Sequence, residues 1–407
     1  MKPLFKNAAI LLVALLLSAC AALSNPFSNP FKESKKSSDK TPVGGAAPFV
    51  EPQTKASTGL TRVWKESIAR TPGKHQQQPA QFMVTDADLF VGTFQGRLLR
   101  LDRERGRPLW EVTVGEQVAG GVGVDEQRVF VGTRNGEMVA LSRENGQELW
   151  RTTLSAPVDS APAVGKGRVI FTTLDNHTYA LNSADGKRLW SHSTPPETLV
   201  VMGSGTPTVD GNVVYVGYAS GDLFALSLEN GAPLWADALA VTGGRTELEL
   251  LQDVDASVVV SQEREGPTAA GMKKLFAVNH QGRAVAVLPR NGARVWEHKL
   301  SAVHRPWLAG QQLFFADMSG AVVALSAGEG IELWRTPVSD GLLTGPVLHG
   351  SKVLVADNRG RLIALDPATG SVLGMDRLGE TFLADPVVAG NSLFLWSNEG
   401  NVQRYDF

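Results

Sequence analysis

A repeated hairpin pattern constrains this chain more than any other feature. Residues 136–150 read Gly-Glu-Met-Val-Ala-Leu, then a polar segment ending in Asn145-Gly146, then Leu149-Trp150 after two further residues. Versions of this pattern recur at residues 96–110, 177–190, 221–235, 282–296 and 320–334, and a degenerate copy covers residues 360–374. Such self-similarity indicates a repeat architecture, in which each unit buries its apolar surface only against its neighbours.

Each copy of the pattern predicts a β-hairpin. An alternating strand is followed by a turn ending in Gly, which supplies the positive φ that a tight turn needs, and by a return strand that carries the tryptophan. In four copies the turn contains an Asn-Gly or Asp-Gly pair, at residues 145–146, 185–186, 230–231 and 291–292. For the unit ending at Trp150, we expect four antiparallel strands at residues 118–124, 128–133, 137–141 and 148–153. Such a hairpin cannot bury both faces alone, so neighbouring units must stack.

The number of copies predicts how the ring closes. The first type of strand occurs eight times if residues 400–405 are included, and the tryptophan-bearing type also occurs eight times if Trp64 opens the series and residues 372–374 close it. The chain therefore begins, at residues 60–68, and ends, at residues 401–407, with strands that lack their partners in sequence. These counts predict an all-β, eight-bladed β-propeller of four-stranded antiparallel blades, closed by pairing of the N- and C-terminal strands. The tryptophans expected to pack between adjacent blades are Trp110, Trp150, Trp190, Trp235, Trp296 and Trp334.

The N-terminus has the pattern of an export signal. Lys2 and Lys6 precede an apolar run at residues 8–17, which is too short to span a membrane as a helix. The following Leu-Ser-Ala-Cys resembles the lipobox of bacterial lipoproteins, which implies cleavage before Cys20 and its acylation; a plain secretory signal is the alternative. Ala21 follows in place of an Asp that would retain a lipoprotein in the inner membrane, so the resemblance implies an outer-membrane anchor facing the periplasm.

The expected organisation has three parts. Residues 1–19 are a lipoprotein signal peptide, residues 20–58 are the lipidated cysteine and a tether rich in Ser, Pro, Lys, Gly and Ala, and residues 59–407 are the propeller. The tether composition is typical of disordered segments. Its Phe and Lys residues could touch lipid or a partner, although a solvated linker is the simpler interpretation.

Composition and motifs argue against several functional classes. A net charge of −2 gives no electrostatic reason to expect nucleic acid as a partner. The repeats resemble those of quinoprotein dehydrogenases, which carry a Cys-Cys pair over the cofactor, whereas Cys20 is the only cysteine here. The seven histidines are scattered without metal-ligand spacing, and no nucleophile elbow or phosphate loop is present. We therefore expect no catalytic residues, no metal and no cofactor.

The lipobox, the tether and the eight repeats together resemble the BamB family, the lipoproteins of the β-barrel assembly machinery. In that family the propeller binds the periplasmic domains of the barrel protein BamA and supports insertion of outer-membrane proteins. The resemblance implies BamA and other barrel-assembly components as partners, with the propeller monomeric within the hetero-complex.

Two segments correspond to the family's BamA-binding connections. The first has the family form Leu-x-Leu-Arg-Gly before Ser-x-Pro-Thr, and it is matched here by Leu199, Val201 and Met202 before residues 205–208. Val201 replaces a leucine and Met202 replaces the arginine, so binding here would depend more on apolar contact. The alternation of Leu199 and Val201 is equally compatible with one face of an inner strand.

The second segment has the family form Thr-Glu followed by Asp-Val-Asp. It is matched by residues 246–247 followed by Asp253 and Asp255. The alternative interpretation is that the two aspartates form a turn at the entry to a strand.

A different function remains compatible with the repeats. A periplasmic ligand-binding propeller, or a degenerate quinoprotein-like one, would have the same pattern. The unit between Trp235 and Trp296 is longer than its neighbours, with extra residues at 240–244 and 262–274, and such insertions map to exposed loops on a binding face.

Overall fold

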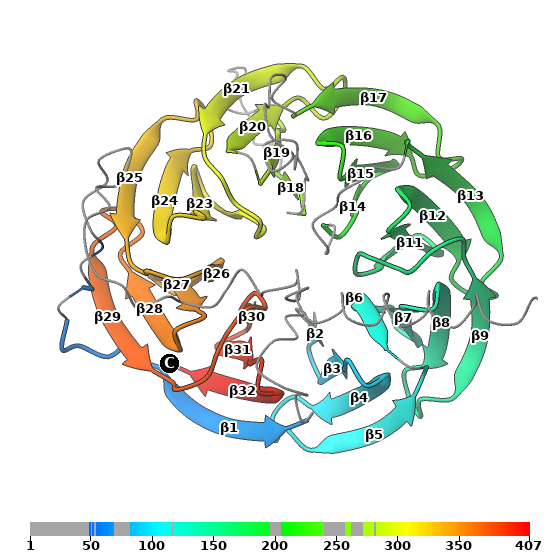
Figure 1. The fold of residues 1–407 in the computed structure, drawn as a ribbon, viewed down its shortest axis with the longest axis horizontal. Coiled ribbons are helices and arrows are strands. Elements are labelled where there is room, and N and C mark those ends of the chain that lie inside the picture. Colours follow the sequence, from blue (N-terminus) through cyan, green and yellow to red (C-terminus); the bar gives the residue numbers. More distant parts are fainter. Residues whose placement is uncertain are drawn as a thin grey trace, which may run out of the picture. The chain divides into compact units, whose positions relative to one another are not determined.

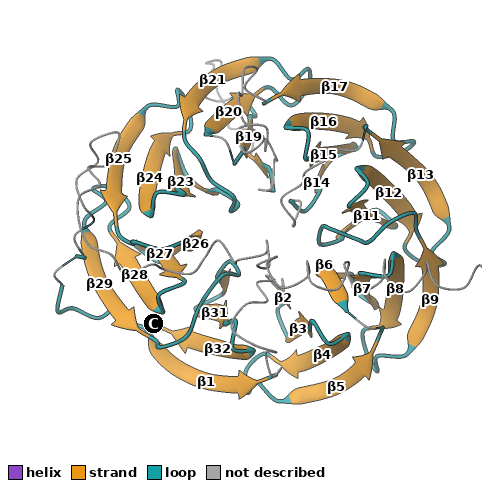
Figure 2. Cartoon of the chain, in the orientation of Figure 1, coloured by secondary structure: helices purple, strands orange, loops and turns teal. Residues whose placement is uncertain are grey.

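Every regular element of the described chain is a β-strand, as Figure 2 shows. The computed structural model describes residues 49, 51–52, 54–68, 82–115, 117–195, 205–239, 257–261, 272–280 and 282–407. Its strands form eight four-stranded antiparallel sheets, the blades of a propeller arranged around a central axis (Figure 1). The predicted eight-bladed architecture is confirmed. No segment in the described part of the chain forms a helix of the length and apolarity needed to cross a bilayer.

The first four blades follow one another along the chain. Blade 1 contains β2 (Phe82–Val84), β3 (Asp88–Gly92), β4 (Arg97–Asp102) and β5 (Pro108–Thr113). Blade 2 contains β6 (Val118–Val124), β7 (Arg128–Thr133), β8 (Glu137–Ser142) and β9 (Glu148–Thr153). Blade 3 contains β10 (Ala163–Gly165), β11 (Arg168–Thr173), β12 (His177–Asn182) and β13 (Arg188–Ser193). Blade 4 contains β14 (Thr208–Asp210), β15 (Val213–Gly217), β16 (Asp222–Ser227) and β17 (Pro233–Ala238).

The last four blades include the one that closes the ring. Blade 5 contains β18 (Val259–Val260), β19 (Leu275–Val278), β20 (Arg283–Val287) and β21 (Arg294–Lys299). Blade 6 contains β22 (Trp307–Ala309), β23 (Gln312–Ala316), β24 (Ala321–Ser326) and β25 (Glu332–Pro337). Blade 7 contains β26 (Leu343–His349), β27 (Lys352–Asp357), β28 (Arg361–Leu365) and β29 (Val372–Arg377). Blade 8 contains β30 (Val387–Ala389), β31 (Ser392–Trp396), β32 (Asn401–Asp406) and β1 (Thr61–Ser67).

The strands of blade 2 agree with the prediction, and only β8 runs one residue further than expected. Its middle strands β7 and β8 are buried, because each blade is covered on both sides by its neighbours. Val129, Phe130 and Val131 are fully buried, which explains why these strands read as continuous apolar runs.

The repeated tryptophan joins one blade to the next, as predicted. The indole Nε1 of Trp190 in blade 3 donates to the Leu228 carbonyl oxygen of blade 4 at 3.0 Å. The ring lies against Gly231, where a Cβ would stand 2.5 Å from the ring atom Cε3. Gly231 also has a φ of 72°, so the turn and the indole contact both require glycine. A buried ring with its polar atom satisfied fixes the spacing and the angle between blades.

Seven blades use the same contact. Each indole nitrogen donates to a carbonyl oxygen of the next blade, in the pairs Trp64–Arg103, Trp110–Arg143, Trp150–Ser183, Trp190–Leu228, Trp235–Pro289, Trp296–Ala327 and Trp334–Pro367.

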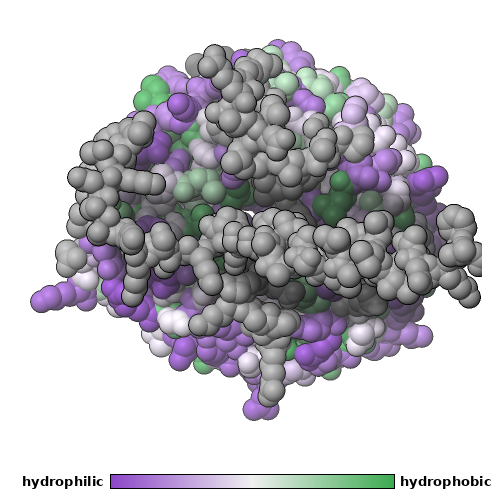
Figure 3. All heavy atoms as spheres, in the orientation of Figure 1, coloured by the Kyte–Doolittle hydropathy of each residue, from purple (hydrophilic) through white to green (hydrophobic). Residues whose placement is uncertain are grey.

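The leucine that precedes the tryptophan is exposed to solvent, whereas the tryptophan packs between blades. Leu109, Leu149, Leu189 and Leu234 are about half exposed on the outermost strands. In Figure 3 hydrophilic residues predominate along the outline of the propeller, with isolated hydrophobic residues among them. Hydrophobic residues that are exposed singly are normal on soluble proteins, so this ring of leucines does not by itself mark an interface.

The predicted pairing of the chain ends is confirmed. Strand β1 pairs antiparallel with β32, from Thr61 opposite Asp406 to Ser67 opposite Asn401. Trp64 of this strand then reaches blade 1, where its Nε1 donates to the Arg103 carbonyl oxygen at 3.2 Å.

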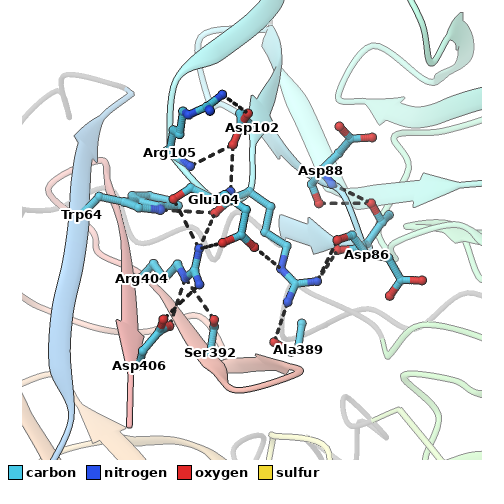
Figure 4. A network of polar contacts seen from close by, with 12 residues as sticks. Trp64, Asp86, Asp88, Asp102, Glu104, Arg105, Ala389, Ser392, Arg404 and Asp406 are labelled. Carbon is cyan, nitrogen blue, oxygen red and sulfur yellow. Dashed lines mark hydrogen bonds and ion pairs between the residues drawn. The ribbon is translucent and has the colours of Figure 1, made fainter.

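Two arginines reinforce the same junction between blades 8 and 1 (Figure 4). Arg404 donates from Nε to Ser392 Oγ at 3.0 Å and pairs with Asp406 at 3.0 Å within blade 8, and with Glu104 of blade 1 at 2.5 Å. Arg103 of blade 1 donates to the Ala389 carbonyl oxygen at 2.8 Å. The closing junction is therefore held by backbone pairing, an indole and charge-assisted hydrogen bonds.

The eighth docking position lies between blades 7 and 8. It has no tryptophan, because blade 8 has no hairpin turn between its third and fourth strands to receive one. Its third and fourth strands, β32 and β1, belong to opposite ends of the chain. Residues 54–58, which the sequence predicts to be tether, occupy this position instead. The Ala56 carbonyl oxygen accepts from the Met375 N–H at 2.9 Å, and the Thr58 N–H donates to Asp376 Oδ2 at 3.1 Å.

We call residues 54–58 the latch. A Cβ at Gly374 would lie 2.1 Å from the Ser57 carbonyl oxygen, so the latch passes directly over the glycine that replaces the tryptophan. Thr58 is fully buried, and its carbonyl oxygen accepts from Lys352 Nζ at 2.7 Å. The compact unit accordingly begins at Phe49.

Replacing a docking tryptophan should destabilise the propeller strongly. We expect Trp190→Ala to lower the free energy of unfolding by about 3–5 kcal/mol, because a cavity forms and the Leu228 carbonyl oxygen loses its donor. The matched control is Leu189→Ala, which should change it by less than about 0.5 kcal/mol because Leu189 is 45% exposed. Urea unfolding of both variants measures the difference, and equal effects would show that the indole does not anchor the blades.

The latch can be tested through Gly374. We expect Gly374→Ala to cost about 1–3 kcal/mol in a chain that retains residues 54–58, because the new methyl group displaces the latch. In a chain that starts at Gly59, the same substitution should be close to neutral. The four proteins form a double-mutant cycle by urea unfolding. An equal cost in both chain lengths would mean that the latch does not occupy this position in solution.

Candidate functional site

The residues predicted to bind a partner lie outside the described residues. This holds for Leu199, Val201, Met202, Asp253 and Asp255. It also holds for the predicted lipidation site Cys20, and for most of the predicted insertions at 240–244 and 262–274. The structure does describe the strands and flanking residues between which the two connections run.

The two connections are successive members of one topological class. Residues 196–204 join β13 of blade 3 to β14 of blade 4, and residues 240–256 join β17 of blade 4 to β18 of blade 5. Each runs from the outer strand of one blade to the inner strand of the next. Because strands alternate in direction within a blade, all such connections start and end on one face of the propeller, and the Asn-Gly hairpin turns lie on the opposite face.

Hydrogen bonds join the C-terminal flanks of the two connections. The Thr206 N–H donates to Ser257 Oγ at 2.8 Å. Two residues further on, Thr208 Oγ1 donates to the Val258 carbonyl oxygen at 3.0 Å. Thr206 lies two residues after the end of the first connection, and Ser257 directly follows the second, so the described flanks of the two connections adjoin across the boundary between blades 4 and 5.

A central cavity of about 830 Å³ shares its wall with these flanks. Thr206, Pro207 and Ser257 line it, together with residues of the inner strands and of other connections between blades. Most of the lining is apolar, including Val118, Val158, Val303, Trp307, Met318, Val347 and Leu383. Its volume lies within the range of small-molecule sites, roughly 300–1,000 Å³.

A charged cluster stands on one side of this cavity. His304 Nδ1 and Asp385 Oδ1 are 2.6 Å apart, and the Gly345 N–H donates to the same carboxylate oxygen at 2.9 Å. His304 and Arg305 belong to the connection between blades 5 and 6, whereas Asp385 belongs to the connection between blades 7 and 8. The fold therefore brings together charges that are far apart in sequence.

Burial and ion pairing shift the pKa values of these groups in opposite directions. Burial tends to lower the pKa of His304, but the charge and hydrogen bond of Asp385 outweigh it and raise that pKa above its ordinary value. Burial tends to raise the pKa of Asp385, but His304, the Gly345 N–H and Arg305 together lower it. Burial lowers the pKa of Arg305, although a guanidinium remains protonated at neutral pH.

Within the described ranges, no group of three or more His, Cys, Asp or Glu side chains is arranged to hold a metal ion. The His304–Asp385 pair was not singled out by the sequence. The only available signal was the presence of His304 and Arg305 in a connection between blades, and nothing in the sequence indicated that Asp385 would lie beside them.

Comparisons with known proteins agree on one family. The family model described as outer membrane protein assembly factor BamB matches residues 94–330 and 318–407. The chain is 42% identical over 278 residues to the assembly factor BamB of Pseudomonas aeruginosa, covering 68% of this chain and 70% of that protein. It is 30% identical over 344 residues to BamB of Xanthomonas campestris, covering 81% and 80%.

Solved structures support the same fold. BamB from Moraxella catarrhalis superposes with a TM-score of 0.76 at 22% identity, covering 86% of this chain and all of that one. A europium-containing methanol dehydrogenase also superposes, with a TM-score of 0.71 at 12% identity, covering 86% and 93%. Likeness at this level shows the fold alone, so the enzyme does not extend its chemistry to this chain. The family-model match and the sequence relatives are decisive, and the chain belongs to the family of the outer membrane protein assembly factor BamB.

Proposed function

We propose that this protein is a non-enzymatic scaffold of the outer-membrane β-barrel assembly machinery, and that it binds the periplasmic domains of BamA. The relatives that share its sequence are named outer membrane protein assembly factors, which supports the general role. The BamA-binding surface is assigned to the connections 196–204 and 240–256. The observation that carries this assignment is the Thr206–Ser257 hydrogen bond, because it joins the ends of the two connections on one face.

The two connections supply different kinds of side chain to the proposed interface. The first supplies the apolar residues Leu199, Val201 and Met202, and the second supplies the acidic residues Asp253 and Asp255. Protein interfaces commonly combine an apolar centre with a polar rim. We therefore expect the BamA surface to present apolar side chains beside basic ones.

Charge and polarity changes at these positions should weaken the complex. We expect the combined variant Val201→Glu, Asp253→Lys and Asp255→Lys to reduce copurification of BamA by tenfold or more, since loss of a few central contacts of about 1–2 kcal/mol each has that effect. Quantitative pull-down from detergent-solubilised envelopes measures the change. Unaltered far-ultraviolet circular dichroism shows that the propeller is intact.

A matched control places the same number of acid-to-lysine substitutions on the opposite face. Glu144 and Glu229 are exposed and lie in hairpin turns between third and fourth strands of blades 2 and 4. Glu144→Lys with Glu229→Lys should leave BamA binding unchanged. Full retention of binding by the first variant, or equal loss in both, would overturn the assignment.

The lipid anchor is a separate part of the proposal. Acylation of Cys20 would hold the protein to the outer membrane from its periplasmic side, with the tether between membrane and propeller. The test combines Cys20→Ser with the variant that weakens BamA binding. We expect the combined protein to move from the membrane fraction to the soluble periplasmic fraction. If it stays with membranes, lipid is not what anchors it.

A further inference from the structure

The guanidinium of Arg305 lines the central cavity without a carboxylate of the described residues within hydrogen-bonding distance. Part of the Arg305 side chain remains open to solvent, although neighbouring atoms bury enough of it to lower its pKa. Among the described residues it forms no ion pair or hydrogen bond, and Asp385 acts on it only electrostatically. A guanidinium in such surroundings provides planar, bidentate donors for a carboxylate.

The carboxylate of Asp385 forms no hydrogen bond with Arg305. Asp385 is already held by His304 Nδ1 at 2.6 Å and by the Gly345 N–H at 2.9 Å. Arg134 and Asp159 add one charge of each sign to the wall, and each has contacts of its own. Among the residues that the structure describes, none occupies the donors of Arg305, which we take to be available to a ligand.

The rest of the wall suits an apolar body. Val303 of the connection that carries Arg305 lines the cavity with Trp307 and Met318 of blade 6, and valines from several inner strands line other parts of the wall. Small-molecule sites have this composition, with a mainly apolar lining and a few convergent polar groups that fix orientation.

We propose that the central cavity is a binding site for a small amphiphilic carboxylate, with its carboxylate on Arg305 and its hydrocarbon body against the apolar wall. This site is distinct from the proposed BamA contact, although Thr206 and Ser257 lie in the walls of both regions. The proposal does not depend on BamA binding.

The test uses a fluorescent acid and its uncharged analogue. 1-Pyrenebutyrate and 1-pyrenebutanol share the same apolar body, and fluorescence anisotropy measures the binding of each. The full chain carrying Cys20→Ser serves as the detergent-free background, because detergent micelles would absorb the probes. We expect the acid to bind at least about tenfold more tightly than the alcohol, as a charge-assisted hydrogen bond at a partly buried site provides.

Three variants locate the site. Arg305→Gln should weaken binding of the acid about tenfold and leave the alcohol unchanged, whereas Arg305→Lys should retain part of the preference. Val303→Trp should narrow the cavity beside Arg305 and weaken both probes. The control is Arg359→Gln, because Arg359 is an exposed arginine that does not line the cavity.

The outcomes decide the proposal. Selective loss of acid binding in Arg305→Gln, with the control unchanged, supports it. Equal binding of acid and alcohol, no effect of Arg305→Gln on either probe, or no binding of the acid would overturn it. Thermal unfolding of each variant confirms that the propeller remains folded in every comparison.

Discussion

The docking of an indole from one blade onto a glycine turn of the next is the interaction on which this propeller depends. The contact combines a buried ring, a satisfied N–H and a backbone conformation that only glycine adopts without strain, as at Trp190 and Gly231. Seven repetitions define the angle between neighbouring blades and therefore close the ring at eight. The eighth position cannot use an indole, because the two strands that would flank its turn are the two ends of the chain. The latch at residues 54–58 occupies that position with main-chain hydrogen bonds, and it couples the start of the propeller to blade 7.

This construction separates stability from function. The indoles, the glycine turns and the buried middle strands define the frame, whereas the connections from one blade to the next lie outside the repeated pattern. The proposed BamA contacts come from two such connections, and the flanks of these connections are joined through Thr206 and Ser257. The same class of connection supplies His304, Arg305 and Asp385 to the cavity. Function in this family of folds is therefore expected on the face where these connections gather.

The sequence predicted the repeated parts and missed the parts that occur once. Strand boundaries in blade 2, the pairing of β1 with β32 and the packing of the tryptophans follow from a pattern that is repeated many times, so local signals reinforce one another. The latch was not predicted, because Gly374 has the appearance of a degenerate copy and residues 54–58 resemble the polar tether. The His304–Asp385 pair was not predicted because the two residues come from connections without a repeating pattern, and only closure of the ring brings them together. The proposed partner residues, such as Val201 and Asp253, came from a family resemblance and remain predictions.

The central functional claim is that BamA contacts the face on which the connections between blades gather. Site-specific photocrosslinking in intact cells tests it most directly, with a photoreactive amino acid placed at Thr206 on that face and at Glu229 on the hairpin-turn face. The account predicts a crosslink to BamA from position 206 and none from position 229. A BamA crosslink from position 229 alone, or equal crosslinks from both positions, would contradict it.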